Sequence, residues 1–434
     1  MLRFPRVTAW LDRTHPAVFS AYAILAAFST YFCMYAFRKP FAAGTFAGTV
    51  ELPYVGALSY KTVFIVSQVL GYCTSKFLGI KVISEMTAAR RAVSILGVIS
   101  LAWAALLAFA VVPAPWSALC LFVNGLPLGM VWGLVFGFLE GRRLSEVLGA
   151  GLSASYILAS GVVKSLGKAM MAAGVDEYWM PFMVGAIFAL PMAVFVTMLA
   201  NLPPPSPEDI AARTRRQPMD GPARKAFFGR YFVGLSALTL LYVLLTAYRD
   251  FRDNFAVEIW AELGYEGSPE ILATAEIPVT VGTLVALGLL MLVKDNRKAL
   301  LLVHALMASG TALVGLSTVA FHTGTIGPAA WMVCLGLGLY IAYVPYGCVL
   351  FDRLFAAVGA VGTAGFLIYV TDAFGYLGSV ALMLYKDLGQ AELSWLEFFT
   401  GFSYITAIAC TSLFVLSLVY FARHARRPVP AASR

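Results

Sequence analysis

Long uncharged apolar runs alternate with short polar segments along almost the whole chain. Each run has about 20 residues, enough for a helix to cross the hydrocarbon core of a bilayer. A transmembrane β-barrel would instead need short segments of alternating polarity, and these are absent. The pattern therefore predicts an all-α integral membrane protein with twelve transmembrane helices, near 17–37, 62–80, 92–113, 117–139, 147–172, 178–200, 231–257, 271–293, 299–321, 327–351, 358–385 and 396–422.

One polar segment, 201–227, interrupts this rhythm at the midpoint of the predicted helices. It contains the run Pro203-Pro204-Pro205 and several basic residues, a composition typical of a linker. An ordinary long loop is the alternative. We expect a cytoplasmic linker between an N-terminal half, 1–200, and a C-terminal half, 228–434, with six helices each.

The two halves resemble internal repeats. Glu85, after the second predicted helix, and Asp295, after the eighth, lie 210 residues apart, and clustered basic residues follow each of them. The same offset carries Arg38 to within one residue of Arg249. Chance similarity is the alternative. Repeated halves are typical of secondary transporters, in which the solute binds at the interface between the repeats.

Composition and charge distribution agree with a membrane protein. Hydrophobic residues make up 60% of the chain, charged residues 12%, and the mean hydropathy is +0.81. If both termini are cytoplasmic, 22 of the 31 Lys and Arg residues fall on the cytoplasmic side, and only Lys61 and Lys386 fall on the other. This bias predicts a multi-pass protein of the bacterial inner membrane with cytoplasmic termini. The bias also explains the net charge of +8, because basic residues on the cytoplasmic side face anionic lipid. The expected partner of this charge is therefore the lipid bilayer and not a nucleic acid.

The sequence lacks the residue patterns that several classes of chemistry require. The six cysteines fall within predicted spans at no metal-binding or disulfide spacing, so we expect free, packed thiols. The four histidines are spread along the chain, and no phosphate-binding Gly-x-x-x-x-Gly-Lys-Ser/Thr loop occurs. We therefore expect no metal, no cofactor, no enzymatic activity and no ATP-driven transport.

Cationic side chains stand out at membrane depth. Arg38 ends the uncharged run 17–37, and an Arg at that depth costs about 2.5–3.5 kcal/mol and usually faces a cavity. Snorkelling to the outer interface is the alternative for Arg38, and it is our expectation for Lys39, which a helix would turn about 100° away. A surplus of four cations over acids predicts a pocket for an anion. The cations are Arg38, Lys39, Lys76, Lys164, Lys168, Arg249 and Arg252, and the acids are Asp250, Asp253 and Asp372.

Some members of this set keep two interpretations. Lys76 either lines the pocket or snorkels to the cytoplasmic surface. Lys164 and Lys168, four residues apart on one helix face, line an outer vestibule or lie at the interface. Arg252 and Asp253 either serve the pocket or form a structural cluster with their neighbours Arg249 and Asp250.

Asp372 is the only charge in the 31-residue run 355–385, so snorkelling is difficult for it. It balances a pocket cation, couples transport to a proton, or is a structural Asp bonded to a Lys or Tyr. Tyrosines near these positions, including Tyr35, Tyr156 and Tyr369, are candidates to bind the solute through their hydroxyls. Most of the 20 tyrosines are expected to pack or to lie at the membrane interface.

The helix number, the two halves and the charged loops after helices two and eight resemble the major facilitator superfamily. Its loop pattern is a Gly, an acidic residue and then clustered basic residues, which this chain matches loosely twice. In that superfamily the charges latch the halves together on the cytoplasmic side. The resemblance implies gating roles for Glu85, Arg90, Arg91, Asp295 and Arg297, and ordinary positive-inside charge is the alternative.

Three stretches are similar to the organophosphate:phosphate antiporters of that superfamily. They are Tyr35-Ala36-Phe37-Arg38-Lys39-Pro40-Phe41, Gly71-Tyr72-Cys73-Thr74-Ser75-Lys76-Phe77, and Gly362-Thr363-Ala364-Gly365-Phe366 with Phe374-Gly375-Tyr376-Leu377-Gly378. The resemblance implies that Arg38 and Arg249 bind phosphate with Lys76 nearby, in that branch or in a separate bacterial membrane-protein family. The histidine of the antiporters' fifth helix is not matched, and Tyr156 lies near that place.

We therefore predict a monomeric secondary transporter of a small anionic solute that works by alternating access. A phosphorylated metabolite exchanged for phosphate is the leading candidate. The first alternative is proton-coupled symport of a carboxylate or sugar acid through Asp372. The second is a membrane sensor that binds a sugar phosphate and signals through a partner.

Overall fold

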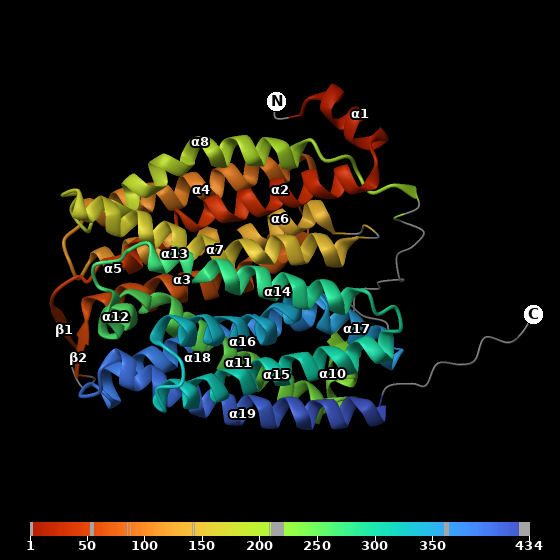
Figure 1. Cartoon of the computed structure of the whole chain (residues 1–434). Helices are drawn as coiled ribbons and strands as arrows, with labels where there is room; N and C mark the ends of the chain where they lie inside the picture. The colour runs from red at the N-terminus through yellow and green to blue at the C-terminus, as the bar shows by residue number, and fades with distance from the viewer. Residues whose placement is uncertain are drawn as a thin grey trace, which may run out of the picture.

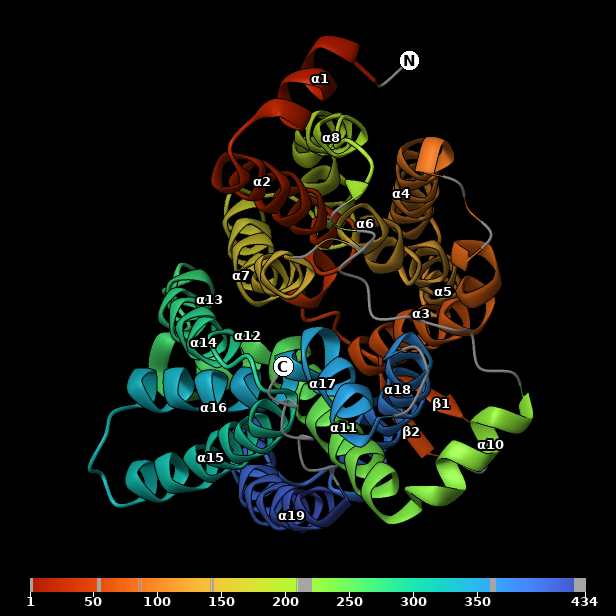
Figure 2. The same ribbon diagram turned by 90° about the vertical axis from the view of Figure 1, so that its right-hand side faces the viewer.

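The computed structural model of the chain describes residues 3–424 apart from 53–55, 85, 87, 141, 143, 208, 210–220 and 360–363. The side chains of residues 52, 79–84, 88–89, 221–224, 364–366 and 369 are also outside the description. In this part, ten helical stretches are long and apolar enough to cross a membrane. Two further helices, α3 (Tyr60–Ser84) and α18 (Ala364–Gly389), have 25 and 26 residues. Together they make an all-α bundle of twelve long helices in two six-helix halves, as predicted (Figures 1 and 2).

The N-terminal half begins with the short helix α1 (Pro5–Arg13), which lies outside the bundle (Figure 1). Besides α3, its long helices are α2 (Pro16–Tyr35), α4 (Ala88–Val111), the pair α5 (Ser117–Leu128) and α6 (Val131–Leu139), α7 (Ser145–Ala172) and α8 (Met180–Ala200).

The C-terminal half begins with α10 (Gly221–Arg230). Besides α18, it contains α11 (Phe232–Asn254), α12 (Ala256–Trp260) with the π-helical turn Ala261–Tyr265, α13 (Ile271–Thr274), α14 (Glu276–Met291), α15 (Asn296–His322), α16 (Pro328–Cys348), α17 (Leu350–Val358) and α19 (Trp395–His424). The predicted boundaries of the linker, 201–227, stay a prediction, and residues 208 and 210–220 of it lie outside the described residues.

Local sequence signals set several helix ends. Pro16, Pro181 and Pro328 lie in the first turns of α2, α8 and α16, where a backbone N–H has no partner within the helix. Asp295 caps α15, because its Oδ1 accepts a hydrogen bond from the backbone N–H of Lys298 at 2.7 Å. Pro127 lies just before the break between α5 and α6.

A small β-hairpin, absent from the sequence-based prediction, follows α2. Strand β1 (Thr49–Leu52) pairs antiparallel with β2 (Gly56–Ser59), and Thr49 lies opposite Ser59. The backbone N–H and the Oγ of Ser59 both bind a carboxylate oxygen of Asp387 near the end of α18, at 3.2 and 2.9 Å. We call this end of the bundle the hairpin side, and the opposite end, where α1 lies and α19 ends, the terminal side (Figure 1).

The two halves meet along two seams. Helix α3 packs against α18, and α7 packs against α13, α14 and α16. At the second seam the backbones are very close: a Cβ on Gly161 of α7 would lie 2.0 Å from the carbonyl oxygen of Leu272 on α13. Only glycine allows this approach, as in other tightly packed membrane helices. The seams place charged residues of both halves next to one another.

Candidate functional site

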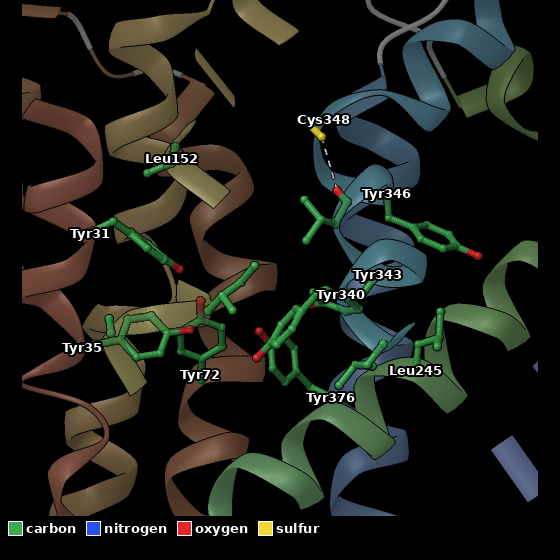
Figure 3. Packing of buried hydrophobic residues seen from close by; sticks show 14 of the residues in the cluster. Tyr31, Tyr35, Tyr72, Leu152, Leu245, Tyr340, Tyr343, Tyr346, Cys348 and Tyr376 are labelled. Carbon is green, nitrogen blue, oxygen red and sulfur yellow. Dashed lines mark hydrogen bonds between the residues drawn. The ribbon is translucent and has the colours of Figure 1, made fainter. Parts of the chain in front are cut away.

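A polar cavity lies between the two halves. Its empty volume is about 540 Å³, and we call it the tyrosine cavity. Figure 3 shows tyrosines of α2 and α3 facing tyrosines of α16 and α18 across this region. The lining residues are Tyr31, Tyr35, Arg38, Tyr72, Lys76, Trp132, Ser153, Tyr156, Tyr242, Arg249, Tyr343, Gly347, Ile368, Asp372 and Tyr376.

Arg38 lies in the turn that follows α2 and is buried, with 3% of its surface exposed. Its guanidinium carbon lies 4.0 Å from the ring centroid of Tyr72 and 5.8 Å from that of Tyr35. Among the described residues no carboxylate pairs with this guanidinium, and its Nε has no hydrogen-bond partner. Arg38 therefore does not snorkel to the interface. It is a buried cation stabilised by aromatic rings but not by an acid.

Two amide side chains fix the backbone around Arg38. Gln68 of α3 donates a hydrogen bond to the Arg38 carbonyl at 2.8 Å and another to Oδ1 of Asn124 at 2.7 Å. Asn124 of α5 donates to the carbonyls of Phe37 and Ala102, both at 2.9 Å. The bonds to Phe37 and Arg38 satisfy carbonyls of the turn that follows α2, and the bond to Ala102 ties Asn124 to α4. The position of Arg38 thus depends on α3 and α5.

A close approach of α3 and α5 makes this arrangement possible. A Cβ on Gly71 would lie 2.1 Å from the carbonyl oxygen of Phe122, and one on Gly125 would lie 2.2 Å from that of Gln68. The two glycines therefore let Gln68 and Asn124 meet beneath the turn that carries Arg38.

Lys76 and Asp372 form an ion pair across the cavity wall. The Lys76 ammonium on α3 lies 3.0 Å from Oδ2 of Asp372 on α18, so the pair joins the two halves. The hydroxyl of Tyr242 donates a hydrogen bond to the other carboxylate oxygen. Asp372 is thus bonded to both a Lys and a Tyr, one of the arrangements that its isolation in sequence left open. Lys76 is buried and does not snorkel.

A chain of hydrogen bonds links this pair to Arg249. The Arg249 guanidinium donates to the hydroxyl of Tyr343, which lies 2.9 Å from the hydroxyl of Tyr242. Each hydroxyl has one proton, so Tyr343 donates to Tyr242 and Tyr242 donates to Asp372. Arg249 also pairs with Asp250, whose Oδ1 lies 2.6 Å from Nη2 and 3.1 Å from Nε. All donors of the chain therefore point toward Asp372.

The remaining predicted solute-binding residues are all tyrosines. Tyr35 and Tyr156 line the tyrosine cavity. The ring centroid of Tyr156 lies 6.2 Å from that of Tyr340 and 6.4 Å from that of Tyr343, so it contacts the opposite half. Tyr369 lies on α18, and its side chain is outside the described part of the structure. Binding by Arg38, Lys76, Arg249 and these tyrosines stays a prediction.

A second group of charges joins the two halves on the hairpin side. Asp253 of α11 accepts from Lys39 at 2.6 Å and from Lys164 at 2.8 Å, and both lysines belong to the N-terminal half. Lys39 also donates to Asn254 at 2.7 Å. The expectation that Lys39 snorkels is wrong, because α2 has already ended at Tyr35 and the chain turns inward. We call Lys39, Lys164 and Asp253 the hairpin-side gate.

Glu276 is a buried acid that the charge count from sequence left out. It begins α14, and its Oε1 lies 2.8 Å from Nη1 of Arg252. Arg252 therefore does not pair with Arg249 and Asp250 as a local cluster. The surplus of cations predicted from sequence falls from four to three, because Glu276 neutralises one cation.

A small cavity with an empty volume of about 300 Å³ lies beside the gate. The pairs Lys164–Asp253 and Arg252–Glu276 both line it. We call it the gate cavity. Its charged lining residues are Lys164, Arg252, Asp253 and Glu276, and Ser160 and Tyr340 add hydroxyl groups.

The predicted gating residues contact their own halves in the described part of the structure. Arg91 donates to the carbonyl of Gly137, Arg297 donates to that of Ala422, and Asp295 caps α15. Arg90 is exposed on α4, and Glu85 lies outside the described residues. Their gating role stays a prediction.

The ion pair that joins the halves on the terminal side was not predicted. Arg353 of α17 lies 2.9 Å from a carboxylate oxygen of Glu146 on α7. In the sequence Arg353 counted only as one more cytoplasmic cation. Its position after the tenth predicted helix was the available signal, but a partner 207 residues away cannot be read from a single sequence.

No metal-binding cluster occurs within the ranges that the structure describes. The six cysteines are free thiols, and Cys33, Cys73, Cys348 and Cys410 are buried. The site thus offers cations, tyrosine hydroxyls and ion pairs, groups that are chemically suited to a polar solute.

Comparisons with known proteins agree with this architecture. The structure is similar to a D-xylose–proton symporter, with 17% identity, a TM-score of 0.56 and coverage of 94% of this chain and 98% of that one. It is also similar to a mutant of the nucleoside transporter NupG, with 14% identity, a TM-score of 0.56 and coverage of 93% and 99%. A structure of the proton:xylose symporter XylE with 6-bromo-6-deoxy-D-glucose gives 17% identity and a TM-score of 0.54, with coverage of 94% and 96%. The fold is therefore that of the major facilitator superfamily.

At the sequence level the matches are fewer. No curated protein sequence matches the chain. One family model matches residues 40–424, most of the chain, and its description is a family of unknown function, DUF5690.

Proposed function

The chain belongs to the DUF5690 family, and we propose that it is a secondary transporter of a small organic anion that works by alternating access. The major facilitator fold supports transport, because the similar structures are those of transporters. Resemblance of the segments around Arg38 and Lys76 to organophosphate:phosphate antiporters favours a phosphorylated metabolite or phosphate as the solute.

The observation that carries the proposal is the guanidinium of Arg38 in the tyrosine cavity, which no acid pairs with in the described part of the chain. A buried cation without an acid is costly, and a bound anion removes that cost. Arg presents two parallel N–H donors, the geometry that phosphate and carboxylate oxygens accept. The other two cations of the cavity already have partners, Lys76 with Asp372 and Arg249 with Asp250. Arg38 is therefore the primary anion-binding residue.

The other lining groups suit a small polar body attached to the anion. Tyr31, Tyr35 and Tyr376 offer hydroxyls for solute oxygen atoms, and Arg249 approaches the same space through Tyr343. A second anionic oxygen would compete with Asp250 for Arg249. This competition favours a compact phosphate or phosphate monoester over a long multivalent anion.

Proton-coupled symport of a carboxylate is the second candidate, and one observation favours it. Asp372 lines the same cavity and ends the hydrogen-bond chain from Arg249. A proton on Asp372 would release Lys76 as a second cation for the solute. Exchange needs phosphate on the far side of the membrane, whereas symport needs a proton gradient.

Alternating access requires closures that break in turn on the two sides of the cavity. The hairpin-side gate and the Glu146–Arg353 pair are the corresponding contacts between the halves. The distribution of Lys and Arg supports a cytoplasmic position for the terminal side and both termini, in the inner membrane of a bacterium. We propose a monomer as the working unit, because the cavity is complete within one chain.

The proposal is tested with purified protein in liposomes. Uptake of radiolabelled phosphate is measured into liposomes preloaded with phosphate or with buffer alone. Exchange predicts uptake only into the preloaded vesicles, and a proton gradient that drives uptake without preloading supports symport instead. Arg38→Ala should abolish uptake, and Arg423→Ala, an exposed arginine at the end of α19, is the matched control. Phosphate and carboxylate solutes that all fail to enter, or uptake that survives Arg38→Ala, would refute the proposed site.

A further inference from the structure

The gate cavity contains a carboxyl group whose bonding is incomplete. Glu276 has 9% of its surface exposed, and only its Oε1 is bound, by Arg252. Its Oε2 is buried and has no hydrogen-bond partner among the described residues, and the same holds for Nε of Arg252. An ionised carboxylate accepts several hydrogen bonds, so one unsatisfied oxygen disfavours the charged form.

We propose that Glu276 is a proton-binding site that controls the hairpin-side gate: its protonation favours opening of that side. The inference rests on the alternating-access transport proposed above, but not on the identity of the anion. It differs from coupling through Asp372, because both oxygens of Asp372 are engaged, by Lys76 and by Tyr242.

The charge balance across the gate gives the direction of the effect. The N-terminal half contributes two positive charges, Lys39 and Lys164, and both reach Asp253. The C-terminal half contributes Arg252, Asp253 and Glu276, one net negative charge. Opposite charge therefore holds the halves together on this side. Protonation of Glu276 brings the C-terminal contribution to zero, and the attraction between the halves weakens.

The groups that face Glu276 from the neighbouring helices support this balance. They are Arg252 and Asp253 on α11, Lys164 on α7 and the neutral hydroxyl of Tyr340 on α16. Arg252 keeps one protein partner after Glu276 is neutralised, because its Nη2 donates to the carbonyl of Met332 at 3.2 Å. Lys61 pairs with Glu258 nearby, and this pair between the halves is unchanged by the proton.

Linkage makes the effect reciprocal. If the proton favours the open hairpin side, opening that side must raise the proton affinity of Glu276 by the same factor. The proton comes from the medium on the hairpin side and is bound by the carboxylate as a neutral carboxyl group. Closing the gate returns it. A lower pH on the hairpin side therefore increases the fraction of molecules that are open to it.

The gate is monitored without any solute, so the experiment does not depend on the anion. Spin labels are placed at Ala173, after α7, and at Glu266, beyond α12, two exposed positions on the hairpin side of opposite halves. The six native cysteines are replaced by alanine, and the full chain is placed in lipid nanodiscs. Distance distributions are recorded between about pH 8 and about pH 5, a range that ends just above the titration of an ordinary carboxyl group.

The chain with Glu276 intact should show a severalfold rise of the long-distance population as the pH falls. Glu276→Gln, which copies the neutral form, should show the long distance at every pH. Glu270→Gln removes an exposed acid six residues earlier and should behave like the unchanged chain. The inference would be overturned if Glu276→Gln kept the pH response of the unchanged chain. It would also be overturned if Asp372→Asn abolished that response and Glu276→Gln did not.

A second measurement covers the case in which Glu276→Gln does not fold. Infrared difference spectra of the natural chain between the two pH values should contain a carbonyl band of a protonated carboxyl group. Isotope-labelled glutamate should shift this band, and isotope-labelled aspartate should not. A band that only labelled aspartate shifts would overturn the inference. Failure of phosphate uptake in liposomes would refute the proposed anion transport and leave both of these measurements unaffected.

Discussion

The carboxylate of Asp372 on α18 lies 3.0 Å from the ammonium group of Lys76 on α3, and this ion pair joins the two halves at the wall of the tyrosine cavity. The pair neutralises two of the charges that line the cavity and leaves Arg38 as the cation without an acid among the described residues. The proposed solute site and a contact between the halves thus share the same side chains. A solute that draws Lys76 away from Asp372 would loosen one seam of the molecule.

Asp372→Asn should destabilise the protein and impair uptake. Loss of one partner of a buried pair costs about 3–5 kcal/mol, because the other charge stays buried and unpaired. Thermal unfolding in detergent should show a lower midpoint, and Asp12→Asn, at an exposed aspartate of α1, should not. The double variant Lys76→Asp with Asp372→Lys exchanges the two charges, and its unfolding midpoint should lie above that of Asp372→Asn. An unchanged midpoint in Asp372→Asn would contradict the importance of the pair.

Arg38→Lys should weaken phosphate binding although it keeps the charge. Lysine presents a point charge and lacks the planar fork that donates two parallel hydrogen bonds. We expect the KM for phosphate to rise at least about tenfold, which corresponds to ~1.4 kcal/mol. Arg423→Lys is the matched control at an exposed arginine. Equal KM values in both variants would mean that Arg38 does not bind the anion directly.

Asn124→Ala should displace Arg38 without removing a residue that we propose to contact the solute. The change removes two donated hydrogen bonds, to Phe37 and Ala102, and the acceptor of Gln68. Unsatisfied buried partners cost about 1–3 kcal/mol each, so the unfolding midpoint should fall. The KM for phosphate should rise as well, which a general loss of folded protein does not produce. A lower midpoint with an unchanged KM would limit Asn124 to a structural role.

Gly161→Ala should keep the hairpin side from closing. The added Cβ would lie 2.0 Å from the carbonyl oxygen of Leu272. Because this distance is too short, the backbones of α7 and α13 must move apart. The long-distance population between labels at Ala173 and Glu266 should therefore increase at neutral pH. Gly97→Ala, on α4 with open space around the added Cβ, should leave the distribution unchanged. Equal distributions in the two variants would show that the approach at Gly161 does not limit closure.

Glu146→Gln should have the opposite effect, because it acts on the other side. It breaks the ion pair with Arg353 that joins the halves on the terminal side. Molecules should shift toward the state that is open on the terminal side and closed on the hairpin side. Labels at Ala173 and Glu266 should then show a smaller long-distance population. An increase would mean that the Glu146–Arg353 pair does not oppose the hairpin-side gate.

Several features of the site were accessible from the sequence for simple reasons. Arg38, Lys76 and Arg249 were identified because a charge inside an apolar run is costly wherever the chain folds. The offset between the repeats then paired Arg38 with Arg249, and both line the tyrosine cavity. The sequence did not reveal which cation lacks an acid, because ion pairs form between helices that are distant along the chain.

The errors have a common physical origin. Lys39 was placed on a continuing helix, but the helix ends at Tyr35 and the turn carries Lys39 to Asp253. Glu276 was overlooked because it lies at the edge of an apolar run, where an acid normally faces water. The hairpin 49–59 was missed because two four-residue strands give too short a pattern for periodicity to detect.

The sequence by itself determined the membrane-spanning architecture and the presence of costly buried cations. Both follow from the energetics of single residues in hydrocarbon, which need no knowledge of neighbours. Only the tertiary structure decided how those charges are balanced: Lys76 by Asp372, Arg249 by Asp250, Arg252 by Glu276, and Lys39 with Lys164 by Asp253. Electrostatic interaction depends on distance in space, and packing of the two halves sets that distance. That packing brings tyrosines to Arg38 and, among the described residues, no acid, which is why we propose it as the anion-binding cation.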